Sequence, residues 1–187
     1  MFGPVPGRSP AAEIDPDADP EAVARTLCLR WLNERPHTRG ELATKLAKKG
    51  VPAEAAGSVL DRFIEVGLVD DAAFASAWVQ SRHTGRGLAR SALRQELRRR
   101  GVDAHTIEGA VDEVSGADEM ARARALVAKK ITATRGLDPA ARTRRLAGML
   151  ARKGYPPGVV YQVVRDAIAA EGTDPALAGM DADTLDD

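Results

Sequence analysis

Arginine is the residue type that gives this sequence most of its chemical potential. Between positions 82 and 100 there are seven arginines and only one acidic residue, Glu96. A guanidinium group keeps its charge at any physiological pH and can hold a phosphate or a carboxylate through two parallel hydrogen bonds. We therefore predict a surface that binds an anionic partner. The residues that would form it are Arg82, Arg86, Arg90, Arg94, Arg98, Arg99 and Arg100.

Smaller basic pairs stand just before a glycine at two other places in the chain. Lys48 and Lys49 form the first pair, and Arg152 and Lys153 form the second. Both pairs, like the arginines before Gly101, stand at the same place in a sequence repeat that is described below. Equivalent positions of stacked repeats lie on the same side of the stack. We therefore expect these pairs to extend the arginine cluster into one basic stripe, which would face DNA phosphates or an acidic groove of a protein.

The formal net charge of zero hides an uneven distribution of charge. Residues 24–170 contain 26 basic and 16 acidic residues, whereas residues 1–23 carry a net charge of −4 and residues 171–187 a net charge of −6. A basic body between two acidic ends favours a polyanionic partner, either nucleic acid or an acidic protein. Two solubilising ends on an ordinary arginine-rich domain are the alternative explanation.

Catalytic and metal-binding patterns are weak in this sequence. The three histidines, His37, His83 and His105, lie far apart without another ligand at metal-binding spacing, so we expect them to be solvated near helix ends. The single cysteine, Cys28, excludes an internal disulfide and is expected in the core. Residues 85–87 lack the rest of a phosphate-binding loop. We expect no enzyme activity, no metal and no cofactor.

The aromatic residues favour a core role over base stacking. Trp31, Phe63, Phe74, Trp78 and Tyr161 all fall on apolar faces of the expected helices. Proteins that bind single strands use exposed aromatic rings as stacking platforms, and side chains that read bases are mainly polar. Any contact with DNA is therefore expected to be with phosphates, with strong dependence on salt.

The elements that must position these residues are predicted to be helices. Ala, Leu, Arg and Glu are abundant and favour helix, and no run alternates as a strand would. A Leu-x3-Leu-x3-Gly-apolar pattern starts at Leu42 and returns 51 and then 53 residues later. This period predicts three three-helix repeats stacked into an elongated array. The boundaries that we expect are a disordered end at 1–19, repeats at 20–69, 70–115 and 116–170, and an acidic disordered end at 171–187.

Local signals support the helix starts. Asp19-Pro20 and Asp138-Pro139 each combine an N-cap with a proline in the first turn, and Thr38 with Glu41 forms a capping box. Helical periodicity also places Arg90, Arg94 and Arg98 side by side, where we expect them to be exposed and unnecessary for folding.

No apolar run reaches the ~20 residues of a membrane span, and the first residues do not resemble a signal peptide. We expect a cytoplasmic protein.

The motifs of the second repeat resemble those of the RecX regulatory proteins. Residues 67–75, Arg82, Gly87 and residues 93–102 are similar to the central motif of that family. Thr38, Glu41-Leu42 and Lys49-Gly50 resemble the motif of its first repeat, although Arg39-Gly40 stands where the family usually has Arg-Ser. Residues 151–155 resemble the motif of its third repeat.

The resemblance implies three tandem three-helix repeats in a curved rod without catalytic residues. It also implies a monomer that binds in the groove of the RecA–single-stranded DNA filament and reduces ATP hydrolysis, strand exchange and filament growth. Two other classes of protein share the charge pattern of the sequence. One is a general basic, helical nucleic-acid-binding protein, which would bind naked single- or double-stranded DNA. The other is a helical-repeat scaffold for a different acidic protein.

Overall fold

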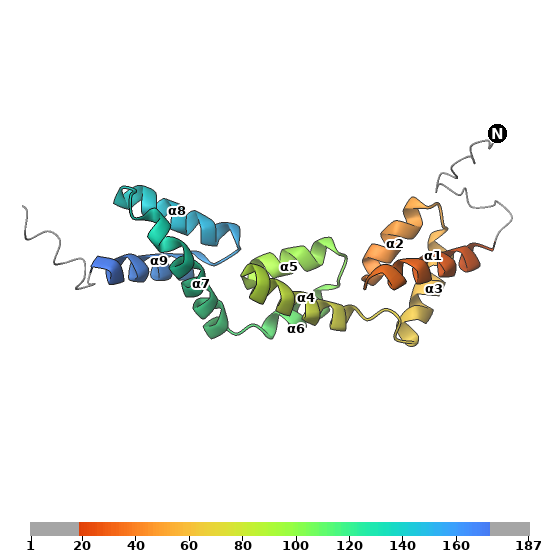
Figure 1. Ribbon diagram of the computed structural model, residues 1–187. Helices are drawn as coiled ribbons and strands as arrows, with labels where there is room; N and C mark the ends of the chain where they lie inside the picture. The colour runs from red at the N-terminus through yellow and green to blue at the C-terminus, as the bar shows by residue number, and fades with distance from the viewer. Residues whose placement is uncertain (1–18, 173–187) are drawn as a thin grey trace, which may run out of the picture. The chain divides into compact units, whose positions relative to one another are not determined.

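The computed structural model describes residues 19–172, and all regular structure in that range is helical (Figure 1). The helices are α1 (Pro20–Glu34), α2 (Arg39–Lys48), α3 (Ala53–Glu65), α4 (Asp71–Arg86), α5 (Arg90–Arg99), α6 (Ala104–Asp112), α7 (Gly116–Ile131), α8 (Pro139–Arg152) and α9 (Pro157–Gly172). A short 3-10 helix, Thr132–Thr134, follows α7. The predicted all-α class with three groups of three helices is confirmed. The predicted disordered ends lie outside the described residues, apart from residues 19, 171 and 172.

The predicted N-caps start the helices for which they were proposed. The Asp19 carboxylate accepts a hydrogen bond from the Glu21 amide at 3.1 Å. The Asp138 carboxylate accepts two, from the amides of Ala140 and Ala141 at 3.1 and 3.0 Å. Each bond satisfies an amide that has no partner within its own helix. The proline after each aspartate loses nothing by lacking an amide hydrogen, which is why this pair of residues starts a helix well.

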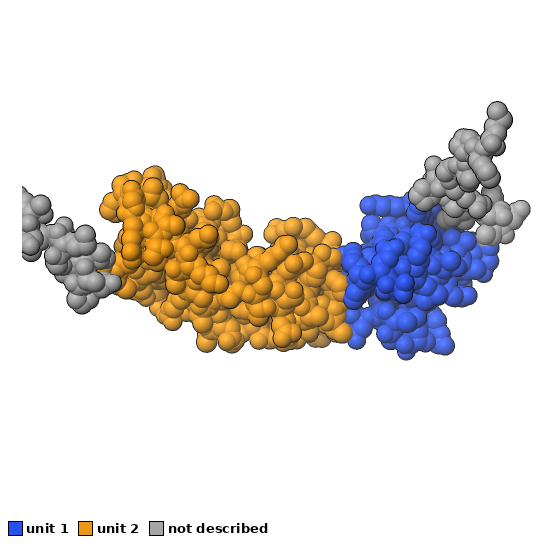
Figure 2. All heavy atoms as spheres, viewed as in Figure 1, with its two compact units in different colours: residues 1–71 blue, residues 72–187 orange. Residues whose placement is uncertain are grey.

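The described helices fall into two compact units. Of the described residues, 19–71 belong to the first unit and 72–172 to the second (Figure 2). The first repeat therefore stands as a unit of its own, while the second and third repeats share one. The elongated array expected from the sequence concerns the arrangement of both units and stays a prediction.

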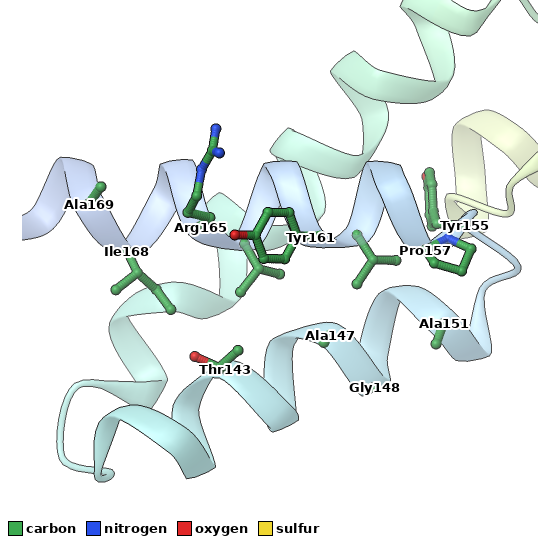
Figure 3. A pocket seen from close by; sticks show the side chains of 12 residues that line it. Thr143, Ala147, Gly148, Ala151, Tyr155, Pro157, Tyr161, Arg165, Ile168 and Ala169 are labelled. Carbon is green, nitrogen blue, oxygen red and sulfur yellow. The ribbon is translucent and has the colours of Figure 1, made fainter.

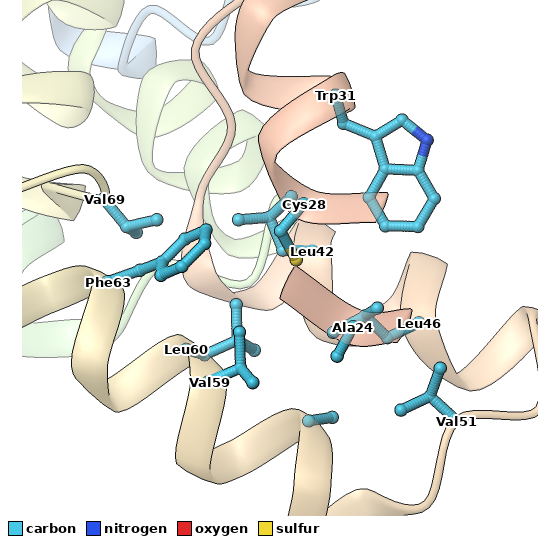
Figure 4. Close-up of a cluster of buried hydrophobic side chains, with 11 residues drawn as sticks. Ala24, Cys28, Trp31, Leu42, Leu46, Val51, Val59, Leu60, Phe63 and Val69 are labelled. Carbon is cyan, nitrogen blue, oxygen red and sulfur yellow. The ribbon is translucent and has the colours of Figure 1, made fainter. Parts of the chain in front are cut away.

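The core of the first unit is built from one apolar stripe of each of its helices. Cys28 and Trp31 of α1 pack with Leu42 of α2 and Leu60 of α3 (Figure 4). Burial raises the pKa of the Cys28 thiol to about 11, so this sulfur stays protonated and unreactive at neutral pH. Ile64 of α3 lies outside this core and is 45% exposed. The preceding residue on α3, Phe63, fills the core instead.

The second and third repeats each have an apolar core, and a shared core residue and a backbone hydrogen bond join the two repeats. Leu93 and Leu97 belong to one apolar cluster, and Leu146 and Leu150 belong to the other. Ala89 lies in the cluster of the third repeat although it immediately precedes α5. Its amide donates a hydrogen bond to the Lys153 carbonyl at 2.9 Å. This backbone bond joins the start of α5 to the end of α8.

Glycine allows the close approach of these two repeats. Gly154 has a φ of +85°, and a Cβ atom placed there would lie 2.7 Å from the Ala92 backbone nitrogen. Beside it, the buried Tyr155 hydroxyl donates a hydrogen bond to the Gly87 carbonyl at 3.1 Å. Gly87 also has a positive φ, and a Cβ atom on it would meet Leu126 at 2.9 Å. The glycines of the sequence motifs therefore serve both chain reversal and packing between repeats.

Candidate partner-binding surface

Two arginines of the predicted cluster form ion pairs between α5 and α6. The Arg94 Nε donates to both carboxylate oxygens of Glu108, at 3.0 and 2.9 Å. This bond holds the pKa of Glu108 below its ordinary value and raises that of Arg94. Arg90 also forms an ion pair, in which its Nη2 donates to a single carboxylate oxygen of Asp112. The expectation that Arg90 and Arg94 are exposed and unnecessary for folding is therefore wrong on exposure, because both are half-buried against the neighbouring helix.

The backbone at the start of α5 is also held by an acidic residue. The amide of Arg90 donates to the buried Glu119 carboxylate of α7 at 2.9 Å. In the first unit the Arg39 amide, at the start of α2, donates to the Asp71 carboxylate at 2.8 Å. A carboxylate at a helix N-terminus is favoured by the helix dipole and by the unpaired amides there. Acidic residues thus fix the positions of the helices that carry the basic residues.

Three arginines of the cluster remain exposed and form no ion pair with any residue in the range 19–172. Arg86 stands at the end of α4, and Arg98 and Arg99 stand in the last turn of α5. Cations are stable at helix C-termini because the carbonyl groups there carry partial negative charge. These guanidinium groups have donors available for an outside anion. They form the centre of the candidate surface.

Two further arginines cover an aromatic ring. The guanidinium carbons of Arg82 and Arg100 lie 4.0 and 3.7 Å from the centroid of Trp78. Phe74 stacks on the same indole with centroids 5.7 Å apart. The indole nitrogen donates to Glu96 at 2.9 Å. This group, Phe74–Trp78–Arg82–Arg100, is hereafter the aromatic–arginine stack.

The aromatic–arginine stack was not expected from the sequence, which placed both rings in the core. Phe74 and Trp78 are half-buried instead, with guanidinium groups where other core side chains would pack. A signal for the stack was available, because residues four apart share a helix face and positions 74, 78 and 82 follow that spacing. Nothing in the local sequence indicates that Arg100 joins them, since it comes from the end of another helix.

The basic pairs outside the second repeat have different surroundings. Lys48 and Lys49 are exposed at the end of α2 in the first unit, and Arg152 is exposed at the end of α8. Lys153 differs from them, because its ammonium group donates to the Arg86 carbonyl at 2.5 Å. One stripe that includes all four residues would extend over both units, and it stays a prediction.

The histidines do not form a site. No group of three or more potential metal ligands occurs among residues 19–172. The expectation that all three are solvated is wrong for His37, which is 4% exposed and whose Nδ1 lies 3.0 Å from a Glu41 carboxylate oxygen. Burial lowers the pKa of His37 despite that carboxylate. No helix in the same range is long and apolar enough to cross a membrane.

Tyr161 also departs from the expectation of a core role. Its side chain is 69% exposed on α9. It stands over a groove between α8 and α9, which Figure 3 shows from close by. Ala147 and Gly148 of α8 line the opposite side of this groove. No motif in the sequence indicates this groove, because it results from small side chains.

Comparisons with known proteins agree with the helical organisation. Models of the first, second and third three-helix domains of RecX match residues 24–63, 70–111 and 117–164. The regulatory protein RecX of Streptomyces coelicolor is 55% identical over 166 residues, which are 89% of this chain and 88% of that protein. That of Thermobifida fusca is 53% identical over 169 residues, covering 90% and 89% of the two chains.

Solved structures share the fold. The crystal structure of RecX from Lactobacillus salivarius superposes with a TM-score of 0.72 and 16% identity, covering 79% of this chain and 96% of that one. A second structure of a regulatory protein RecX has a TM-score of 0.69 and 24% identity, covering 79% and 72%. At these identities the likeness concerns the fold alone. Together with the geometry above, it defines a helical-repeat protein of three three-helix domains. The sequence matches go further, and the chain belongs to the RecX family of regulatory proteins.

Proposed function

We propose that this protein is a non-enzymatic regulator that binds the RecA–single-stranded DNA filament and inhibits its ATPase activity, strand exchange and growth. The observation that carries the proposal is family membership over all three three-helix domains. Relatives that match about nine-tenths of the chain are named regulatory proteins. Binding to RecA is what the sequence motifs of this family imply.

The candidate surface offers suitable chemistry for an anionic filament. Arg86, Arg98 and Arg99 present guanidinium groups that have no ion pair with a described residue. Charged hydrogen bonds of this kind contribute about 1.5–3 kcal/mol each where they form. We assign outer contacts to Arg82, Arg100, Lys48, Lys49 and Arg152 as well. Arg90, Arg94 and Lys153 would act by holding the surface in place, since internal acceptors already engage them.

The proposal is tested by removing the three exposed guanidinium groups together. The variant Arg86→Ala, Arg98→Ala, Arg99→Ala should fold like the wild type, because exposed substitutions change stability by about 0.5 kcal/mol or less. It should require at least about tenfold more protein to inhibit RecA, since one lost charged hydrogen bond corresponds to about a factor of ten. The measurements are RecA ATPase on single-stranded DNA and filament length by electron microscopy.

A matched control separates local contacts from total charge. Arg124, Lys129 and Lys130 are exposed on α7, and their replacement by Ala removes the same three positive charges. This control should inhibit RecA nearly as well as the wild type at physiological salt. Equal loss of inhibition in both variants would mean that overall charge decides binding, and unchanged inhibition in both would place the contacts elsewhere.

A general nucleic-acid-binding protein is the second candidate, and the aromatic–arginine stack favours it. Arginine and aromatic rings together are typical of surfaces that bind single strands. Such a protein would bind naked DNA as tightly as the RecA filament, with affinity falling steeply as salt rises. Fluorescence anisotropy with labelled single-stranded DNA, with and without RecA, distinguishes the two. A scaffold for another acidic protein would leave RecA activity unchanged.

A further inference from the structure

The third repeat contains an apolar groove. It lies between α8 and α9 and has a volume of about 760 Å³ (Figure 3). On the α8 side the lining residues are small: Ala147, Gly148 and Ala151. From α9 come larger apolar groups that point across the groove, including Tyr161 and Ile168.

The groove occupies the place of the ion pairs in the second repeat. Each of its lining residues can be compared with the residue 53 positions earlier in the sequence. The arginine stripe of α5, Arg90, Arg94 and Arg98, is replaced on α8 by Thr143, Ala147 and Ala151. The acidic residues of α6, Glu108 and Asp112, are replaced on α9 by Tyr161 and Arg165. In the first repeat only the Arg90–Asp112 pair has a counterpart, Arg39 with Asp61 at 2.8 Å, while Ala43 and Gly57 stand at the positions of Arg94 and Glu108.

Loss of these side chains leaves apolar surface uncovered. Ile107 of the second repeat is 1% exposed beneath its helix pair, whereas its counterpart Val160 is only half-buried and lines the groove. Tyr161 is largely exposed beside it. A continuous apolar surface of this kind is typical of a site that another segment covers.

Guanidinium groups stand on both sides of the groove. On α9, Arg165 lies with its guanidinium carbon 5.6 Å from the Tyr161 ring centroid and also pairs with Asp166. On α8, Arg152 Nη1 lies 3.3 Å from where a Cβ atom of Gly148 would be. The groove therefore suits a segment that combines apolar side chains with carboxylates.

The chain itself contains such a segment directly after α9. Residues 173–187 include five aspartates and no basic residue, with Leu177 and Met180 three positions apart. Ile168 and Ala169, which line one end of the groove, lie in the last turns of α9. The groove follows residues 157–169, a helical length of about 18 Å. Eight extended residues span about 26 Å, which leaves several of the 15 residues for a reversal of direction.

We propose that residues 173–187 dock in this groove within the same molecule. Leu177 and Met180 pack over Ala147, Gly148 and Ala151, and the neighbouring aspartates face Arg152 and Arg165. The docked segment covers apolar surface of the third repeat and competes with outside anions for Arg152. This inference does not depend on RecA being the partner. A short connection gives an effective concentration on the order of 1 mM, so a dissociation constant of about 1 mM already gives half occupancy.

Amide hydrogen exchange of the full chain, followed by mass spectrometry, tests the docking. In the variant Leu177→Ser, Met180→Ser the charge is unchanged but the apolar anchors are lost. Peptides from residues 143–151 and 160–168 should then exchange about twofold faster or more. The reason is that a segment docked in half of the molecules halves the fraction of time that these amides are open to exchange. The matched control is Val5→Ser, Ile14→Ser near the other end of the chain, which should leave both peptides unchanged.

A second variant approaches the same site from the groove. Ala147→Arg with Tyr161→Glu restores the residue types of the Arg94–Glu108 pair and should fill the groove. In this background, adding Leu177→Ser and Met180→Ser should no longer change the exchange rates. Equal exchange in the wild type and the Leu177→Ser, Met180→Ser variant would overturn the proposal. Protection that increases with protein concentration would also overturn it, since a second copy would then be the occupant.

Discussion

At the scale of single residues, arginines in one sequence cluster have three different surroundings. Arg94 is held by a carboxylate, Arg82 lies on an indole, and Arg98 is exposed. The side-chain chemistry is the same in each case, so the difference comes from the partner that the neighbouring helix supplies. Only the exposed group has its full hydrogen-bonding capacity available to another molecule. A count of arginines therefore overestimates the strength of the binding surface.

Substitution of the glycines before the third helix of the repeats separates the cost of a left-handed backbone conformation from the cost of a steric contact. Gly154→Ala should destabilise the second unit by roughly 2–4 kcal/mol, because it combines a left-handed conformation with a Cβ only 2.7 Å from Ala92 N. Gly50→Ala is the control, with a φ of +79° and nothing within 4 Å, and should cost only about 1–2 kcal/mol in the first unit. Hydrogen exchange in denaturant measures each unit separately. Equal costs would show that the contact with Ala92 relaxes freely.

Tyr155 makes the second unit sensitive to alkaline pH. Burial raises the pKa of its hydroxyl from 10.0 to about 12. The folded state therefore holds this proton more tightly than the unfolded state. The resulting stability is present in full below about pH 10 and is lost as pH rises to about 12, by at most roughly 2–3 kcal/mol. Urea unfolding at pH 9 to 12 should show a smaller loss of stability in Tyr155→Phe than in the wild type. Parallel curves for the two proteins would contradict this.

At the scale of helices, ion pairs determine how α5 sits on α6. Arg94→Ala should destabilise the second unit by about 1 kcal/mol, because a bidentate pair and the packing of a long side chain are lost together. Arg98→Ala, one turn further along α5, should change stability by less than about 0.5 kcal/mol because Arg98 is exposed. Chemical unfolding followed by circular dichroism measures both. If the two variants have the same stability, the Arg94–Glu108 pair contributes nothing to the fold.

The helices themselves were largely predictable from the sequence, because the signals that start them are local. Asp19-Pro20 and Asp138-Pro139 begin α1 and α8 as expected, and the returning leucine pattern gave the three repeats. A cap is formed by residues two or three apart, so its geometry depends little on the rest of the fold. The same holds for Ser115 with Asp118, a capping box at α7 that sequence reasoning overlooked.

Partners of the candidate surface were not predictable in the same way. Arg94 meets Glu108 from 14 residues away, and the Arg90 amide meets Glu119 from 29 residues away. Such pairs depend on how helices pack and on which rotamers fit, and neither is encoded by local spacing. The groove of the third repeat was missed for a related reason. Ala147 and Ala151 are ordinary helix residues. Their role in forming the groove is recognised only when they are compared with Arg94 and Arg98, which occupy the equivalent positions on α5.

At the scale of the whole molecule, three similar repeats serve unequal purposes. The second repeat carries the densest positive charge, while the third has an apolar groove where the second has the Arg90–Asp112 and Arg94–Glu108 ion pairs. Repeats of one pattern can diverge in this way because each keeps its own core and its own helix caps. The acidic segment that follows the third repeat in the sequence is complementary to this groove in charge and apolarity, as the proposed docking requires.

The boundary of that acidic segment matters for any truncation. The sequence suggested that it begins at residue 171, but α9 extends to Gly172, and Glu171 pairs with Arg135 at 2.9 Å and with Arg142. Removal of Glu171 would therefore weaken the end of α9 as well as remove charge. A deletion that tests the acidic segment alone should start at residue 173.

Deletion of residues 173–187 should tighten binding to a polyanion at low salt. The deletion removes five aspartates from a chain whose residues 24–170 carry a net charge of +10. Fluorescence anisotropy with a labelled single-stranded DNA should show a severalfold lower dissociation constant at 0.01 M salt, where the Debye length is about 30 Å. The gain should vanish near 1 M salt, where that length is about 3 Å. The full-length variant Leu177→Ser, Met180→Ser retains every charge but lacks the apolar anchors, so it should lie between the deletion and the wild type. An affinity for DNA that is unchanged by the deletion at low salt would show that the segment does not compete for the basic surface.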